Sequence, residues 1–285
     1  MSSLTLGQAH AKVDARAKAM QSALEVWLQR FARQQAAEAI EEVKANRGLM
    51  LAFTANKAAA ASPERLKQEL ASIIGRFSKR QIDDAIIKET GGINAPIEFR
   101  VDVVADYMAA KEPLLQKIID DTRIDVRNSI RELITSAFGE SRTPSSGEIA
   151  RRIRNQFHGS GFVPGVDSDF EAAPILGSRV SKTPTGTLYA FSSERAQLIA
   201  RTEMVQAQNT GTMAGYVATG VERIRWLSYR DGRSGRGHDE MYRKTTPVGT
   251  PFILPDGTPM RYPGDPRAPI KHTANCRCTI APVRD

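Results

Sequence analysis

Both cysteines of this 285-residue chain lie in one short segment, Cys276-Arg277-Cys278, and His272 precedes them by four positions. Thiolate and imidazole side chains bind zinc, so the grouping is consistent with a metal site. In a strand, residues two apart point to the same face, which would bring the two sulfur atoms together. The same geometry suits two small apolar side chains packed in a core. A disulfide is the least favoured use, because Cα atoms two apart in a strand lie near the upper limit of bridging distance.

The composition limits the class of protein. Two cysteines are too few for a disulfide framework, so we expect the chain to be made and kept in a reducing, cytoplasm-like compartment. No apolar run approaches the ~20 residues of a membrane span, and the start of the chain lacks the pattern of a secretory signal. We therefore expect no membrane partner.

The charge is divided unevenly along the chain. Residues 1–140 contain 20 basic and 19 acidic side chains, a net charge of +1, whereas residues 141–285 contain 20 and 13, a net charge of +7. Of the 20 basic side chains in the second half, 17 are arginine. Arginine pairs bidentately with phosphate and carboxylate, so this half suits a nucleic acid, an acidic protein surface or internal salt bridges.

The elements that position these residues are predicted to be helical in the first half. Apolar residues at steps of three and four, from Val13 to Val43, predict one long amphipathic helix. The segment Ser62-Pro63-Glu64 is typical of a helix start and predicts a second helix as far as Phe77. A third, shorter helix over residues 80–89 should end at the glycine pair that follows it.

Two features mark the middle of the chain. An amphipathic pattern over residues 98–138 contains Pro113, where we expect the helix to kink or restart. Residues 141–190 are predicted to be a linker with one short helix, 148–157, capped by Ser146.

The C-terminal part is predicted to mix helix and strand. Its elements are expected in this order: a helix from Ser192 to near Gly220, a strand over 221–229, a short polar helix headed by His238, a hairpin with its turn at Pro255-Asp256-Gly257, and a closing strand over 276–283. The fold class is therefore predicted to be α+β, with a helical bundle or extended arm over residues 1–140, the linker over 141–190 and a small α+β domain over 191–285.

A series of short motifs follows in one order through this C-terminal part. It consists of Arg201-Thr202-Glu203 and Asn209 on one helix, Trp226, Asp231-x-Arg233, His238, Tyr262-Pro-Gly-Asp-Pro266 and Asn275-Cys276-Arg277-Cys278. The ordered set resembles the bacteriophage Mu F-like head morphogenesis family, the minor capsid proteins often encoded beside the portal. The resemblance covers roughly residues 190–283, about a third of the chain.

The resemblance implies a minor head protein that joins the procapsid through the portal protein, the major capsid protein or a scaffold. Such a protein would lie in the virion, in the head interior or at the portal vertex, after a period in the host cytoplasm. The basic second half is compatible with contact to packaged DNA. No nucleophile–base pair stands at a recognisable spacing, so we expect no enzymatic activity and no small-molecule substrate.

The metal question stays open from the sequence. Many members of that family carry a Cys-x-x-Cys pair just after the Asp-x-Arg motif, where this chain has Ser234-Gly-Arg-Gly237. A four-ligand zinc set can still be assembled from His238, His272, Cys276 and Cys278. The alternative, with no cofactor, is a metal-free polar cluster that locks helix to strand.

Two functions from other classes remain as alternatives. An enzyme of nuclease, transferase or toxin type would use Glu203, Asp231 and His238, and an arginine-rich adaptor would bind DNA. For the other motif residues we expect structural roles: an anchor of helix to strands for Arg201, a turn with an ion pair for Asp231 and Arg233, a side-chain turn cap for Asn275, and an outward position for Arg277.

Overall fold

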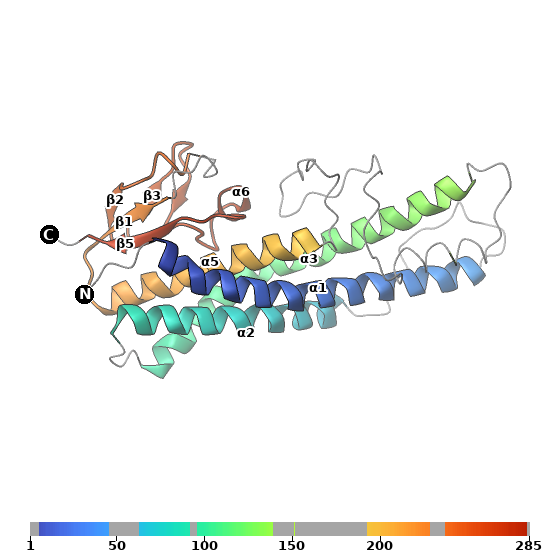
Figure 1. Ribbon diagram of the computed structural model, residues 1–285, viewed down its shortest axis with the longest axis horizontal. Helices are drawn as coiled ribbons and strands as arrows, with labels where there is room; N and C mark the ends of the chain where they lie inside the picture. Colours follow the sequence, from blue (N-terminus) through green and yellow to red (C-terminus); the bar gives the residue numbers. More distant parts are fainter. Residues whose placement is uncertain are drawn as a thin grey trace. The chain divides into compact units, whose positions relative to one another are not determined.

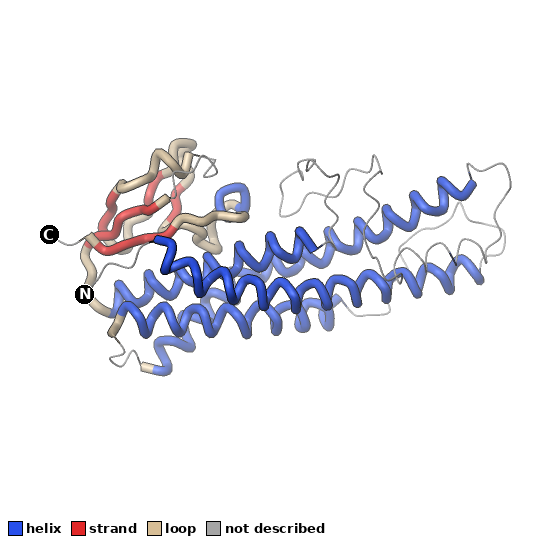
Figure 2. The backbone as a smooth tube through the Cα atoms, viewed as in Figure 1, coloured by secondary structure: helices blue, strands red, loops and turns tan. Residues whose placement is uncertain are grey.

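The computed structural model describes residues 6–45, 63–91, 96–138, 151, 193–228 and 237–283. It confirms an α+β fold, with strands only near the C-terminal end of the described chain (Figure 2). The helices and strands are α1 (Leu6–Ala45), α2 (Pro63–Glu89), α3 (Ile97–Phe138), α5 (Ser193–Ala218), β1 (Arg223–Leu227), β2 (Thr245–Pro247), β3 (Phe252–Ile253), β4 (Pro259–Met260), α6 (Ile270–Thr273) and β5 (Thr279–Pro282) (Figure 1). None of the described helices is long and apolar enough to cross a membrane.

The chain divides into two compact units, and neither is continuous in sequence. The first unit combines the described parts of residues 1–21, 71–113 and 197–285, and the second those of residues 22–70 and 114–196. Helices α1, α2, α3 and α5 each supply a segment to both units. Both the predicted helical region and the predicted C-terminal domain therefore contribute to the first unit.

Helix α1 has the amphipathic pattern that the sequence predicts. The apolar residues at steps of three and four are buried along it, namely Val13, Ala17, Met20, Leu24, Trp27, Phe31 and Ile40. In the second unit, Trp27 and Phe31 pack with their ring centroids 5.5 Å apart. Burial of this stripe, more than intrinsic propensity, stabilises a helix of such length.

Helix α2 is one continuous helix, so the prediction of two separate helices over this stretch was wrong. Ser78 and Gln81 interrupt the apolar stripe, yet both are buried. Gln81 accepts a 2.7 Å hydrogen bond from Arg16 and donates one to Gln208. Hydrogen bonds to a polar partner on each side of Gln81 thus take the place of the apolar contacts that are missing from the stripe.

Helix α3 continues through Pro113, so of the two outcomes predicted there, a kink or a restart, the restart is excluded. Proline cannot donate the hydrogen bond that would reach the carbonyl of Ala109. Both residues are exposed, so water can satisfy that carbonyl. The predicted linker over 141–190 and its short helix lie outside the described residues, except for Arg151, which is helical.

The strands form two small antiparallel sheets among the described residues. The predicted strand over 221–229 is β1, which lies between β2 and β5 in the first sheet. Strands β3 and β4 form the second sheet as a hairpin, with the predicted turn at Pro255-Asp256-Gly257 between them. The positive φ of +82° at Gly257 explains why glycine stands in that turn.

Two local predictions in this region were wrong. The closing strand begins at Thr279, so Cys276 and Cys278 lie in the segment that leads into β5. Residues 237–243 form successive turns rather than the short polar helix predicted there. Their backbone hydrogen bonds join residues three apart, for example Met241 N–H to the carbonyl of His238 at 3.2 Å.

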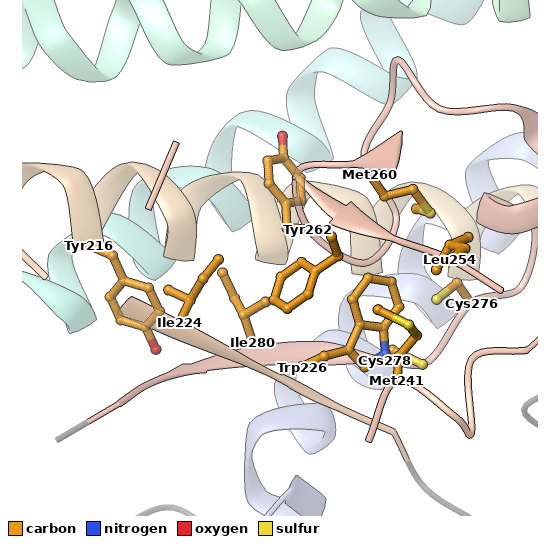
Figure 3. Packing of buried hydrophobic residues seen from close by; sticks show 11 residues of the cluster. Tyr216, Ile224, Trp226, Met241, Leu254, Met260, Tyr262, Cys276, Cys278 and Ile280 are labelled. Carbon is orange, nitrogen blue, oxygen red and sulfur yellow. The ribbon is translucent and has the colours of Figure 1, made fainter. Parts of the chain in front are cut away.

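The C-terminal sheets enclose an apolar core around Trp226 (Figure 3). Its indole packs edge-on against Phe252 and against the imidazole of His238, with both centroid distances 5.3 Å. The two cysteines belong to this core, whose buried members are Tyr216, Ile224, Trp226, Met241, Phe252, Leu254, Met260, Tyr262, Cys276, Cys278 and Ile280.

Helix α5 approaches α2 closely within the first unit. A Cβ atom on Gly211 would lie 2.5 Å from the carbonyl oxygen of Ile82, and one on Gly215 would lie 2.6 Å from Cβ of Glu89. Real Cβ atoms essentially never lie within 3.0 Å of such a neighbouring atom, so these positions require glycine. Close packing against α2 therefore holds α5 in place, and α5 in turn holds the C-terminal strands and turns.

Candidate metal centre

Asn209 on α5 joins the helix to the segment that carries the cysteines. Its buried Nδ2 donates to the carbonyl of Cys278 at 2.9 Å and to that of Pro263 at 2.8 Å. Its Oδ1 accepts a 2.7 Å hydrogen bond from the hydroxyl of Thr279. One side chain thereby fixes the backbone at Cys278 and holds two loops against one helix.

A second link lies one residue before the first cysteine. The backbone N–H of Asn275 donates to the hydroxyl of Thr202 at 2.9 Å. Asn275 has a φ of +53°, in the left-handed region that asparagine tolerates better than most residues. The link therefore uses the backbone amide of Asn275, whereas a side-chain cap was expected, and its side chain is exposed.

Glu203 is an internal anchor of the helices. Its carboxylate is buried, with Oε1 at 2.9 Å from Nζ of Lys111 and Oε2 accepting a 2.7 Å hydrogen bond from the hydroxyl of Tyr107. Burial lowers the pKa of Lys111 even though Glu203 opposes this, and burial with the nearby carboxylate raises the pKa of Tyr107. Arg201, two residues earlier on α5, is exposed.

His238, Cys276 and Cys278 bring three metal-binding atoms together in the C-terminal core. The three atoms lie within 4.8 Å of one another, and all three residues are buried. Nδ1 of His238 lies 3.7 Å from Sγ of Cys276 and 3.8 Å from Sγ of Cys278. With Zn–S bonds of about 2.3 Å and Zn–N bonds of about 2.0 Å, neighbouring ligands of a tetrahedron lie roughly 3.5–3.8 Å apart. The donor types and the two nitrogen–sulfur distances therefore fit zinc.

The two thiols affect each other's ionisation. The Cys278 thiol, and then His238, hold the pKa of Cys276 well below its usual value, although burial opposes this. The same hydrogen bond with Cys276, together with burial, raises the pKa of Cys278 far above its usual range. A divalent cation bound to both sulfur atoms would stabilise both as thiolates.

His272 lies beside this group, but none of the three metal-binding atoms belongs to it. Its ring stacks on that of His238, with centroids 5.8 Å apart and planes 21° from parallel. Its Nε2 lies 2.9 Å from Oδ2 of Asp256, which also accepts a 2.8 Å hydrogen bond from Lys271. Lys271 and Thr258 hold the pKa of Asp256 well below its usual value. Of the four ligands considered from sequence, three are grouped and the fourth is adjacent.

No family model, curated protein or solved structure matches this chain. What the centre can do must therefore be inferred from its own residues.

Sequence reasoning missed several residues of these networks. Lys111 and Tyr107 stand four apart on the buried stripe of α3, and a lysine at an apolar position of such a stripe is a signal of a buried ion pair. Asp256 was recognised only as a turn residue. Of the other motif residues, Asp231 and Arg233 lie outside the described residues, and Arg277 is half-buried.

Proposed function

We propose that this chain is a minor structural protein of a bacteriophage head, incorporated into the procapsid through the portal or major capsid protein. The ordered motif series is the basis of the proposal. The observation that supports it is the use of those motif residues inside the fold: Asn209 and Thr202 on α5 bond the backbone at Cys278 and Asn275. Motif residues that join one element to another are what a structural domain requires.

The role of Glu203 also favours a structural protein over an enzyme. Both of its oxygens are engaged inside the unit, one with Lys111 and one with Tyr107. A general base needs a carboxylate within reach of substrate, and this one is buried and paired.

The test is co-assembly. The chain would be co-expressed with the portal protein, the scaffold and the major capsid protein of the same phage, and procapsids would be purified and analysed by mass spectrometry. We expect the chain in procapsids, and omission of the portal tells whether that protein recruits it. Its absence from particles in every combination would overturn the proposal.

We further propose that the C-terminal part binds one zinc ion structurally through His238, Cys276 and Cys278. The single observation behind this is the buried three-atom group, in which both nitrogen–sulfur distances match those between neighbouring ligands of a tetrahedron. Zinc would close the apolar core and tie the turn after β1 to the segment before β5. Metal analysis of the purified chain tests this: we expect about one zinc per chain in the wild type and none in Cys276→Ser/Cys278→Ser.

Contact with packaged DNA is supported by one face of the first sheet. Arg223 and Arg225 alternate along β1 with the buried Ile224 and Trp226, so they share its outer face. Arg223 is exposed and Arg225 half-exposed. Two guanidinium groups on one strand face suit successive phosphates of a nucleic-acid backbone.

The DNA contact is tested by the salt dependence of duplex binding. Each phosphate contact contributes about 0.9 to the slope of log affinity against log salt. We expect Arg223→Ala/Arg225→Ala to lower the slope by about 2, and the charge-matched control Arg201→Ala/Arg267→Ala, at two other exposed positions, to leave it unchanged. A flat salt dependence in the wild type would exclude binding driven by phosphate.

A further inference from the structure

The zinc centre proposed above names three ligands, and a structural zinc site takes four. The fourth must come from a buried donor close to the other three, because the group lies in an apolar core. His272 is buried, being only 3% exposed, and its ring stacks on that of His238, although its nitrogens are not among the three donor atoms that lie within 4.8 Å of one another.

The hydrogen bond to Asp256 determines the proton position on His272. A carboxylate can only accept, so the 2.9 Å contact to Oδ2 means that Nε2 of the ring carries the hydrogen. In a neutral imidazole the other nitrogen, Nδ1, then has a free lone pair. That Nδ1 is buried and has no hydrogen-bond partner within the described part of the chain. A metal ligand that has no metal bound is expected to show this feature, a buried lone pair that accepts no hydrogen bond.

Asp256 has the position of a residue that orients a ligand. It lies in the β3–β4 turn and accepts hydrogen bonds from Lys271 and from the backbone N–H of Thr258, besides its contact with His272. Metal-bound histidines commonly donate their second nitrogen to a carboxylate, which fixes the tautomer and the ring orientation. The hairpin turn thus supplies what a histidine ligand needs from its surroundings.

We propose that His272 is the fourth ligand of the zinc centre, through Nδ1, and that Asp256 is its positioning residue. This inference rests on zinc binding by His238, Cys276 and Cys278. It also explains the three residues between His272 and Cys276, since ligands separated by two to five residues commonly bind one zinc ion.

One other side chain competes for the role. Oδ1 of Asp239 is also buried without a hydrogen-bond partner among the described residues, and its charge acts on Cys278. His272 is favoured because its orientation is already fixed by a carboxylate, and because its ring contacts that of His238. Variants at both positions separate the two candidates.

The experiment uses the full chain and Co²⁺ as the spectroscopic probe, with zinc affinity measured by competition against a chromophoric chelator. The variants are His272→Gln, Asp256→Asn and Asp239→Asn, and the matched control is Lys271→Ala, which removes another partner of Asp256 but no ligand. We expect His272→Gln to lower zinc affinity at least 100-fold and to change the Co²⁺ d–d spectrum. Asp256→Asn should weaken binding about 10-fold to 100-fold with the spectrum retained. Lys271→Ala and Asp239→Asn should bind like the wild type.

The outcomes distinguish this inference from the proposal on which it rests. If the wild-type chain binds neither zinc nor Co²⁺, the centre itself is refuted. If the wild type binds but His272→Gln keeps its affinity and spectrum, the centre stands and His272 is not the ligand. Loss confined to Asp239→Asn would likewise overturn the inference and assign the fourth position to Asp239. Asp256→Asn retains the imidazole, so it tests the positioning role even if His272→Gln folds poorly.

Discussion

Two buried polar clusters of the first unit differ in how far their own atoms satisfy them. In the helical part, the carboxylate of Glu203 meets Lys111 with one oxygen and Tyr107 with the other, and the ammonium group of Lys111 also lies 5.0 Å from the Tyr107 ring centroid. In the C-terminal core, Nδ1 of His272 is buried without a partner in the described residues. Buried polar atoms are rarely left unsatisfied. The helical cluster is thus complete as it stands, whereas the histidine–cysteine cluster is arranged to receive something more.

The largest expected effect breaks the complete cluster. Glu203→Ala leaves the Lys111 charge buried without a counter-ion, and we predict a loss of about 3–5 kcal/mol in the free energy of unfolding. Urea denaturation measures it, with Arg201→Ala at an exposed position of the same helix as the control, expected to change stability by less than about 0.5 kcal/mol. A loss below about 1 kcal/mol for Glu203→Ala would mean that the pair is not essential to the core.

Removing metal should affect the other cluster alone. Zinc at a free concentration of about 100 times its dissociation constant adds about 2.7 kcal/mol to the free energy of unfolding. We therefore predict that a chelator lowers the unfolding midpoint of the wild type and of Arg201→Ala equally, and leaves Cys276→Ser unchanged. A chelator effect of equal size in Cys276→Ser would contradict the comparison.

Asn209 connects α5 to the cysteine segment, so its removal should destabilise that segment. Asn209→Ala leaves the buried carbonyl groups of Cys278 and Pro263 without their donor, and we predict a loss of about 2 kcal/mol. Zinc affinity should fall with it, because the backbone that carries a ligand is released. The control is Val217→Ala, an exposed residue of the same helix, with both properties expected to stay as in the wild type.

The smallest expected effect concerns acid. Asp265 is buried, which opposes its ionisation, but hydrogen bonds from Arg261 and Arg267 outweigh burial and lower its pKa. A lowered pKa in the folded state gives stability that is present above the unfolded pKa of about 4 and is lost as pH falls through the folded pKa. Asp265→Asn should remove this part of the acid dependence, about 1 kcal/mol, whereas Glu222→Gln at an exposed position should keep it. Urea midpoints between pH 7 and pH 3 provide the measurement, and parallel curves for wild type and Asp265→Asn would refute it.

The comparison also indicates what sequence can and cannot predict. The stripe of α1, the strand β1 and the turn at Asp256-Gly257 were predicted because their signals lie within a few residues of one another. The continuity of α2 was missed because Ser78 is polar but buried. The partner of Lys111 stands 92 residues away and the carboxylate beside His272 stands 16 residues away, and no local period reports such pairs. The cysteine and histidine types indicated a metal site, but only the fold selects which histidine nitrogen is free.

The close contact of α2 with α5 has a consequence for synthesis on the ribosome. Gln81 and Gln208, which bond across this contact, are 127 residues apart in the chain. At a typical elongation rate of about 5–20 residues per second, the matching part of α5 emerges roughly 6–25 s after α2. Throughout that interval the backbone of Ile82, against which Gly211 will pack, has no cover from α5. The contact also closes a long loop, whose entropy must be lost before any packing energy is gained, so we expect this unit to form late and slowly, with chaperones given time to act.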